Sequence, residues 1–166
     1  SGLYGTILMG SERLIEIRDA RGEVGGIQFS LSAKFLGRDP DKSRTEDEEK
    51  NEGRRRELIA RILEEMEHWD FGPDSPPKVQ VEVSGDLSDK GSLRANFRID
   101  APSVEKRQYR LTEMQAAGSL KGYLLEISSF SAKDARGTLD GHADYQLLQR
   151  TGRFDMESSI QIPRLL

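Results

Sequence analysis

A glycine-containing frame occurs three times in this chain and constrains its fold more than any other feature of the sequence. The pattern Ala-x-Gly-x-(Val/Leu)-x-Gly describes residues 20–26, 116–122 and 135–141. In the first and third copies the match extends backward to an Asp-Ala-Arg-Gly sequence, which begins at Asp19 and at Asp134. Each copy lies between runs of alternating apolar and polar residues, as is typical of strands that meet at a glycine bend or bulge. We therefore expect an internally repeated unit of strand, bend and strand.

Alternation of apolar and polar residues predicts strands over most of the chain. The clearest pair is residues 78–86 and 92–100, with a hairpin at residues 87–91 between them. Further strands are predicted at residues 4–9, 13–20, 26–36, 108–116, 119–130, 137–148 and 152–162. Because the connections are short, an antiparallel meander is more economical than any parallel arrangement.

Residues 48–69 are the one segment with a helical period. Charged residues occupy one side of this predicted amphipathic helix, and acidic residues precede it while prolines follow it. The polar side is mixed in sign, which favours packing on the sheet over binding to a membrane surface. The side chains expected to cover the sheet are Leu58, Ile62, Met66 and Trp69. Residues 38–77 are thus predicted to be a loop-helix-loop insertion within a single domain, residues 1–166.

The composition favours a sheet with one face in water. Hydrophobic residues make up 35% of the chain and charged residues 33%, a polar balance for a globular protein. The net charge of -4, with both signs interspersed, argues against nucleic acid as a partner. The absence of cysteine excludes disulfides and thiolate chemistry, and no apolar run is long enough to cross a bilayer. From its first and last residues we expect the chain to be a fragment of a longer protein.

Catalytic and metal-binding patterns are not found in the sequence. His68 and His142 are too far apart in the chain to suggest a shared metal site. A serine such as Ser128 and several aspartates occur near His142, but no nucleophile elbow accompanies them. The glycine-rich residues 22–26 precede a strand, so no helix N-terminus is available to receive a phosphate. We expect a protein that is not an enzyme, with no catalytic residues, no metal and no cofactor.

The C-terminal half shows a recurring cadence of apolar strand, glycine bend and apolar strand. The segments that carry it are residues 109–122, 124–132, 137–145 and 154–166. This cadence resembles that of the AsmA-like and TamB-like envelope proteins of Gram-negative bacteria, in their C-terminal repeat region. The resemblance covers residues 109–166 and extends more loosely to residues 14–35.

The resemblance implies a long, curved sheet whose apolar concave face carries phospholipid acyl chains across the periplasm. It also implies a parent protein tethered to the inner membrane, with neighbouring β repeats on either side and a role in lipid transport or outer-membrane biogenesis. The predicted fold is therefore mainly β (α+β): a curved antiparallel meander of repeated strand-bend-strand units with one amphipathic helix packed on it. The helix departs from the simple strand pattern of that family.

Two hypotheses about function follow. In the first, the chain is a non-enzymatic periplasmic segment that presents an apolar β-groove to lipid, since burial of each CH₂ of an acyl chain gains about 0.8 kcal/mol. The predicted groove-lining residues are Val79, Val81, Val83, Leu93, Phe97, Ile99, Phe154, Met156 and Ile160. In the second, the same face is a core covered by the helix, and the chain is a structural or protein-interaction module.

Overall fold

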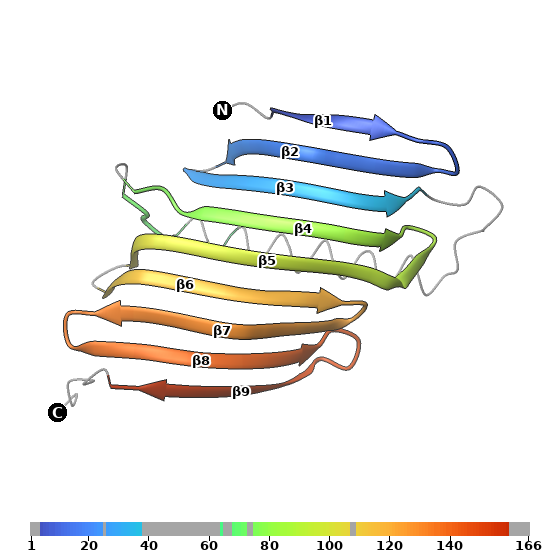
Figure 1. Ribbon diagram of the computed structural model, residues 1–166. Helices are drawn as coiled ribbons and strands as arrows, with labels where there is room; N and C mark the ends of the chain where they lie inside the picture. Colours follow the sequence, from blue (N-terminus) through green and yellow to red (C-terminus); the bar gives the residue numbers. More distant parts are fainter. Residues whose placement is uncertain are drawn as a thin grey trace.

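One open β-sheet accounts for most of the residues that the structure describes. The computed structural model describes residues 4–24, 26–37, 64, 68–72, 75–106 and 109–159. Nine strands lie side by side in the order of the sequence (Figure 1). They are β1 (Tyr4–Met9), β2 (Leu14–Val24), β3 (Ile27–Leu36), β4 (Lys78–Asp86), β5 (Asp89–Lys106), β6 (Tyr109–Lys121), β7 (Leu124–Asp134), β8 (Gly137–Gln146) and β9 (Thr151–Ser158).

The expectation of a wholly antiparallel meander is wrong at one position. Seven of the eight neighbouring pairs are antiparallel, but β3 and β4 run parallel, with Phe29 opposite Val79 and Leu31 opposite Val81. A parallel pair needs a long crossover connection, and residues 37–77 provide one between these two strands. The connection therefore returns the chain in the direction of β3, so that β3 and β4 interrupt the alternation of strand direction across the sheet.

The crossover is described only at its C-terminal end. Of the predicted helix, only Glu64, His68 and Trp69 are among the described residues, and Leu58, Ile62 and Met66 lie outside them. Just after the segment predicted to be helical, Asp70 forms an isolated antiparallel bridge with Glu105 of β5, through two backbone N–H···O hydrogen bonds of 2.7 Å. This bridge attaches the end of the crossover to the extended end of β5.

The three copies of the glycine frame do not occupy equivalent places. In the first two, the final glycine lies in a hairpin, at Gly26 between β2 and β3 and at Gly122 between β6 and β7. These two glycines have φ of 77° and 60°, which other residues adopt at a cost. The third copy begins in the hairpin before β8, so that Gly141 lies inside that strand. The repeat thus marks two similar hairpins and one shifted copy.

Very little of the chain is fully buried. Among the described residues, the buried apolar side chains are small: Ala20, Ala33, Ala101, Val104 and Ala132. The chain exposes 12326 Å², whereas a compact monomer of 18.7 kDa exposes about 8,300 Å². The open sheet of the described residues, with its few fully buried side chains, contributes to this extra surface.

Candidate functional site: the apolar face of the sheet

Three transverse rows of side chains run across one face of the sheet. Because side chains alternate between the two faces of a strand, residues aligned across the strands share a face. The first row consists of Ala20, Leu31, Val81, Phe97, Gly118, Ile127, Ala143 and Phe154. The second consists of Gly22, Phe29, Val79, Ile99, Ala116, Phe130, Gly141 and Met156. The third consists of Ile7, Ile17, Ala33, Val83, Ala95, Leu120, Leu125, Tyr145 and Gly152.

These rows contain no charged residue, and we call them together the apolar face. The third row crosses all nine strands, from β1 to β9. At a spacing of about 4.8 Å between strands, nine strands span about 38 Å. The apolar face is therefore a continuous band rather than a local patch.

The structure brings most of the predicted groove-lining residues together on this face. Val79 lies opposite Ile99, and Val81 lies opposite Phe97. Val83 belongs to the third row, and Leu93 lies two residues before Ala95 on the same side of β5. Phe154 and Met156 lie on the same face but on β9, at the edge of the sheet. Ile160 lies outside the described residues.

Aromatic rings lie opposite glycines in neighbouring strands of this face. Phe97 is aligned with Gly118, and a Cβ added at Gly118 would lie 2.5 Å from the Cζ atom of that ring. Tyr145 stands in the same relation to Gly152, where an added Cβ would lie 2.7 Å from its Cδ2 atom. The same alignment pairs Phe29 with Gly22, Phe35 with Gly85 and Phe130 with Gly141. An aromatic ring that covers a glycine fixes strand register and fills the space that the missing side chain leaves.

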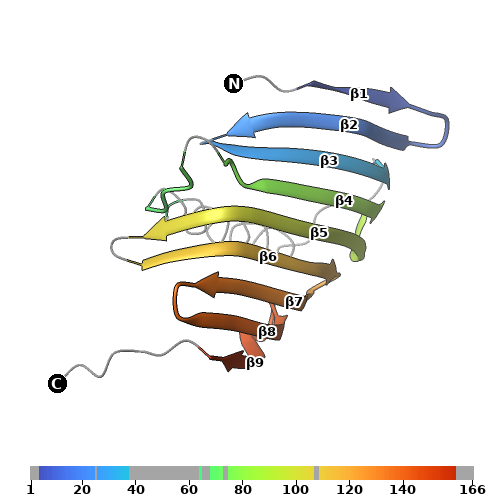
Figure 2. The same ribbon diagram turned by 60° about the vertical axis from the view of Figure 1, so that its left-hand side comes forward.

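Apolar side chains are most exposed at the two edges of the sheet. Ile7 is 62% exposed and Met9 83% exposed on β1, and Phe154 is 61% exposed on β9. Positions in the middle of the sheet, such as Phe97 and Ile99, are half-buried. Figure 2 shows β1 and β9 at opposite edges, with the other strands between them.

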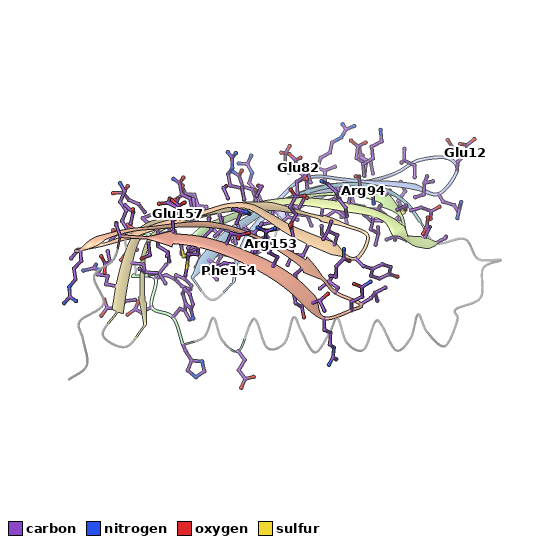
Figure 3. All side chains as sticks on the ribbon, turned by 90° about the horizontal axis from the view of Figure 1, so that it is seen from below. Glu12, Glu82, Arg94, Arg153, Phe154 and Glu157 are labelled. Atoms are coloured by element: carbon purple, nitrogen blue, oxygen red, sulfur yellow. The ribbon has the colours of Figure 1, made fainter. Side chains whose placement is uncertain are left out.

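The opposite face of the sheet is polar. Figure 3 shows the sheet bowed, with the labelled Glu82, Arg94 and Glu157 projecting from its convex side. The Arg18 guanidinium donates two hydrogen bonds of 2.9 Å to the Glu16 carboxylate. That hydrogen bonding holds the pKa of Glu16 below its usual value. The apolar face is thus on the concave side of a sheet whose convex side carries the charges.

Two shallow depressions lie mainly on the polar face. One of about 440 Å³ is lined by Arg18, Ser32, Lys34, Glu82 and Asn96, among others. Another of about 600 Å³ has a lining that includes Arg21, Glu23, Gln28 and Lys78. Both combine cations with carboxylates, so neither has the one-sided charge that would select an anion or a cation.

The histidine considered as part of a catalytic group has a different set of neighbours. His142 Nε2 lies 3.3 Å from Asp155 on β9, and the His142 side chain is 61% exposed. The Ser128 hydroxyl donates a hydrogen bond of 3.1 Å to the backbone oxygen of Ala117. Among the described residues, no group of three His, Asp or Glu side chains is arranged to hold a metal ion.

Comparisons with known proteins do not extend this description. No protein-family model, curated protein or solved structure matches the chain. Within the described part of the chain, no helix has the length and apolar character needed to cross a membrane. The apolar face is therefore the feature of the molecule that bears on function.

Proposed function

We propose that this chain is a non-enzymatic periplasmic segment of an AsmA-like envelope protein, and that its apolar face holds phospholipid acyl chains during lipid transport or outer-membrane biogenesis. The observation that carries the proposal is the continuous apolar band on the concave side of an open sheet. An acyl chain that lies along such a band is held by loss of apolar surface to water alone. No specific polar contact is needed, which agrees with the absence of charged residues from the three rows.

The geometry of the band supports an elongated apolar ligand. Large side chains such as Phe97, Ile99 and Ile127 alternate with small ones such as Ala116 and Gly118. The surface is therefore uneven, with raised and recessed positions. Contiguous exposed apolar surface of this kind marks binding sites for lipid or protein. Neighbouring β repeats of the parent protein would continue the band past the β1 edge of this segment.

One observation favours the second hypothesis, a structural or interaction module with a covered core. Ala101 is 0% exposed and Val104 2% exposed, both near the end of β5 that carries the bridge to Asp70. Trp69 is half-buried beside that bridge. Burial is therefore highest where the crossover is attached to the sheet, as expected if the crossover covers this end of the sheet.

The two hypotheses are separated by paired substitutions on β5. Phe97 and Arg98 are adjacent and point to opposite faces, so Phe97→Glu places a carboxylate on the apolar face and Arg98→Glu places one in water, opposite Gln80 and Ala117. Binding of a phospholipid with a fluorescent acyl chain would be titrated for both variants and the unaltered chain. We expect Phe97→Glu to weaken binding by about tenfold or more, because desolvating a carboxylate costs more than the roughly 1.4 kcal/mol that this loss requires. Arg98→Glu should bind as the unaltered chain does.

Ile7→Glu provides a second test on β1, at a position of the apolar face that contributes little to folding, because this side chain is 62% exposed. It should also weaken binding while the melting temperature stays within a few degrees. Equal binding by all variants would refute the lipid proposal. No binding by the unaltered chain, together with a collapse in stability of Phe97→Glu, would instead support a covered core.

A further inference from the structure

The outer edge of β9 exposes both backbone and apolar side chains. Among the described residues, no strand pairs with this edge. Phe154 and Met156 are 61% and 51% exposed on the apolar face. An open strand edge with apolar side chains is a template for pairing with another strand.

The hydrogen bonding between β8 and β9 determines which backbone groups point outward. The Ser159 N–H donates to the Thr138 oxygen at 2.9 Å, in the same register that aligns Leu139 with Ser158. In an antiparallel pair, residues alternate between those bonded to the neighbour and those that point away. Phe154 and Met156 therefore direct their backbone N–H and C=O groups to the open edge.

This edge is complementary to itself. If two copies of β9 run antiparallel about Phe154, each Phe154 faces the other and each Gly152 faces Met156. On the polar side, Arg153 of each copy faces Asp155 of the other. Within one strand the same two side chains already form an ion pair of 2.8 Å, so the two copies together would bring two cations and two carboxylates into one cluster. Residues whose backbone groups point outward then pair with one another, as an antiparallel ladder requires. Opposite charges directly across a ladder are stabilising, and the aromatic pair adds contact on the apolar side.

The neighbouring register is less favourable. A shift that aligns Phe154 with Met156 still faces Arg153 with Glu157 of the other copy. It also places Asp155 directly opposite Asp155, however, and like charges so placed are destabilising; the register about Phe154 has no such pair. The other edge of the sheet, β1, carries no charged residue, so it offers no ion pairs to specify a register.

We propose that two copies of this chain associate edge to edge through β9, antiparallel about Phe154, to form one sheet of twice nine strands. The two-fold axis is perpendicular to the sheet, so both apolar faces lie on the same side. Such an interface is isologous, the commonest kind in soluble oligomers. It does not depend on what the apolar face binds.

The test uses proline at each edge of the full chain. Met156→Pro removes an outward N–H and leaves the hydrogen bonds to β8 intact, since proline is tolerated where an edge N–H faces solvent. Ile7→Pro is the matched control on β1. The Gly10 N–H donates to the Leu14 oxygen at 2.8 Å, and the alternation from Gly10 leaves the Ile7 N–H pointing outward. Circular dichroism would show that both variants keep the strand signal.

Light scattering would measure the mass of each protein. We expect twice 18.7 kDa for the unaltered chain and for Ile7→Pro, and 18.7 kDa for Met156→Pro. A monomeric unaltered chain would overturn the proposal. If both proline variants were monomers, the contact would join β1 to β9, and if only Ile7→Pro were a monomer, it would join β1 to β1. Either result contradicts a β9 pair.

A cysteine variant keeps the proposal testable should Met156→Pro fail to fold. The chain contains no cysteine, so Phe154→Cys introduces the only thiol. Directly paired residues in an antiparallel ladder have Cα atoms about 5.5 Å apart, within the range of a disulfide. Phe154→Cys should form a dimeric disulfide under mild oxidation, and Arg98→Cys, on the polar face of a central strand, should not. Equal yields from the two variants would overturn the register.

Discussion

Gly118 allows the most direct test of how the apolar face is packed. An alanine Cβ at this position would lie 2.5 Å from Cζ and 2.9 Å from Cε1 of Phe97, and it would also overlap the backbone oxygen of Glu126. The phenyl ring can rotate away, but the backbone of β7 cannot move without disturbing its hydrogen bonds. The φ of Gly118 is not positive, so the cost of Gly118→Ala is steric rather than conformational.

We expect this cost to lie at the upper end of the usual range for overpacking, about 3 kcal/mol. For a domain of this length, 1 kcal/mol corresponds to about 2–4 °C, so the melting temperature should fall by about 6–12 °C. Gly91→Ala is the matched control, because its added Cβ would meet only the movable Asp89 carboxylate, at 3.2 Å. Gly91→Ala should leave stability unchanged or raise it by about 0.5 kcal/mol.

A double-mutant cycle with Phe97→Ala measures how much of the destabilisation by Gly118→Ala comes from the clash with the Phe97 ring. Removing the ring relieves one of the two clashes, so the double variant should be more stable than the sum of the single effects predicts. Thermal melts of the four proteins followed by circular dichroism supply the values. If Gly118→Ala were no more destabilising than Gly91→Ala, the packing of Phe97 on Gly118 would be refuted.

Two further predictions concern the β1–β2 hairpin and strand β2. Glu12 has a φ of 57° in the hairpin between β1 and β2, so Glu12→Asn should stabilise the chain by about 0.5 kcal/mol, because asparagine tolerates this conformation better; a lower urea midpoint would contradict this. Arg18→Gln should raise the pKa of Glu16 toward its ordinary value, as measured by NMR titration, because the main cause of the lowered pKa is the hydrogen bond from Arg18. A lowered pKa contributes stability at pH values above the pKa in the unfolded chain, and this contribution is lost as the pH falls through the pKa in the folded chain. Any difference in melting temperature between Arg18→Gln and the unaltered chain should therefore vanish in acid. An unchanged pKa of Glu16 in the variant would contradict the pairing.

Sequence alternation predicted the strands best where it was uninterrupted. The bounds of β1 and β4 are those expected, and the six central groove candidates lie on one face because the period of a strand is two. Strand β5 is longer than expected, since the Ala101-Pro102 pair interrupts the alternation but not the strand.

Because of Gly118, the sequence pattern predicts the hairpin between β6 and β7 at an earlier position than the one it has in the structure. In the sequence this glycine indicates a bend, whereas in the structure it lies inside β6 opposite Phe97. The turn instead contains Gly122, which has a positive φ. Sequence alone does not tell a glycine that makes a turn from one that accommodates a ring.

The parallel pairing of β3 with β4 was also beyond the sequence pattern. Strand period determines which side chains share a face, but strand direction depends on where the crossover returns to the sheet. The aromatic and glycine pairs were missed for the same reason, since they join strands whose register the pattern does not give. The sequence feature that could have indicated these pairs is the set of glycines opposite Phe29, Phe97 and Phe130.

The central claim, that the apolar face holds lipid, is tested most directly by extracting what the protein carries. The chain would be produced in the periplasm of a Gram-negative host, purified without detergent and extracted with organic solvent. Mass spectrometry would then quantify phospholipid per chain against a control domain treated in the same way. The account predicts phospholipid close to stoichiometric with the protein, and lipid no higher than in the control would contradict it.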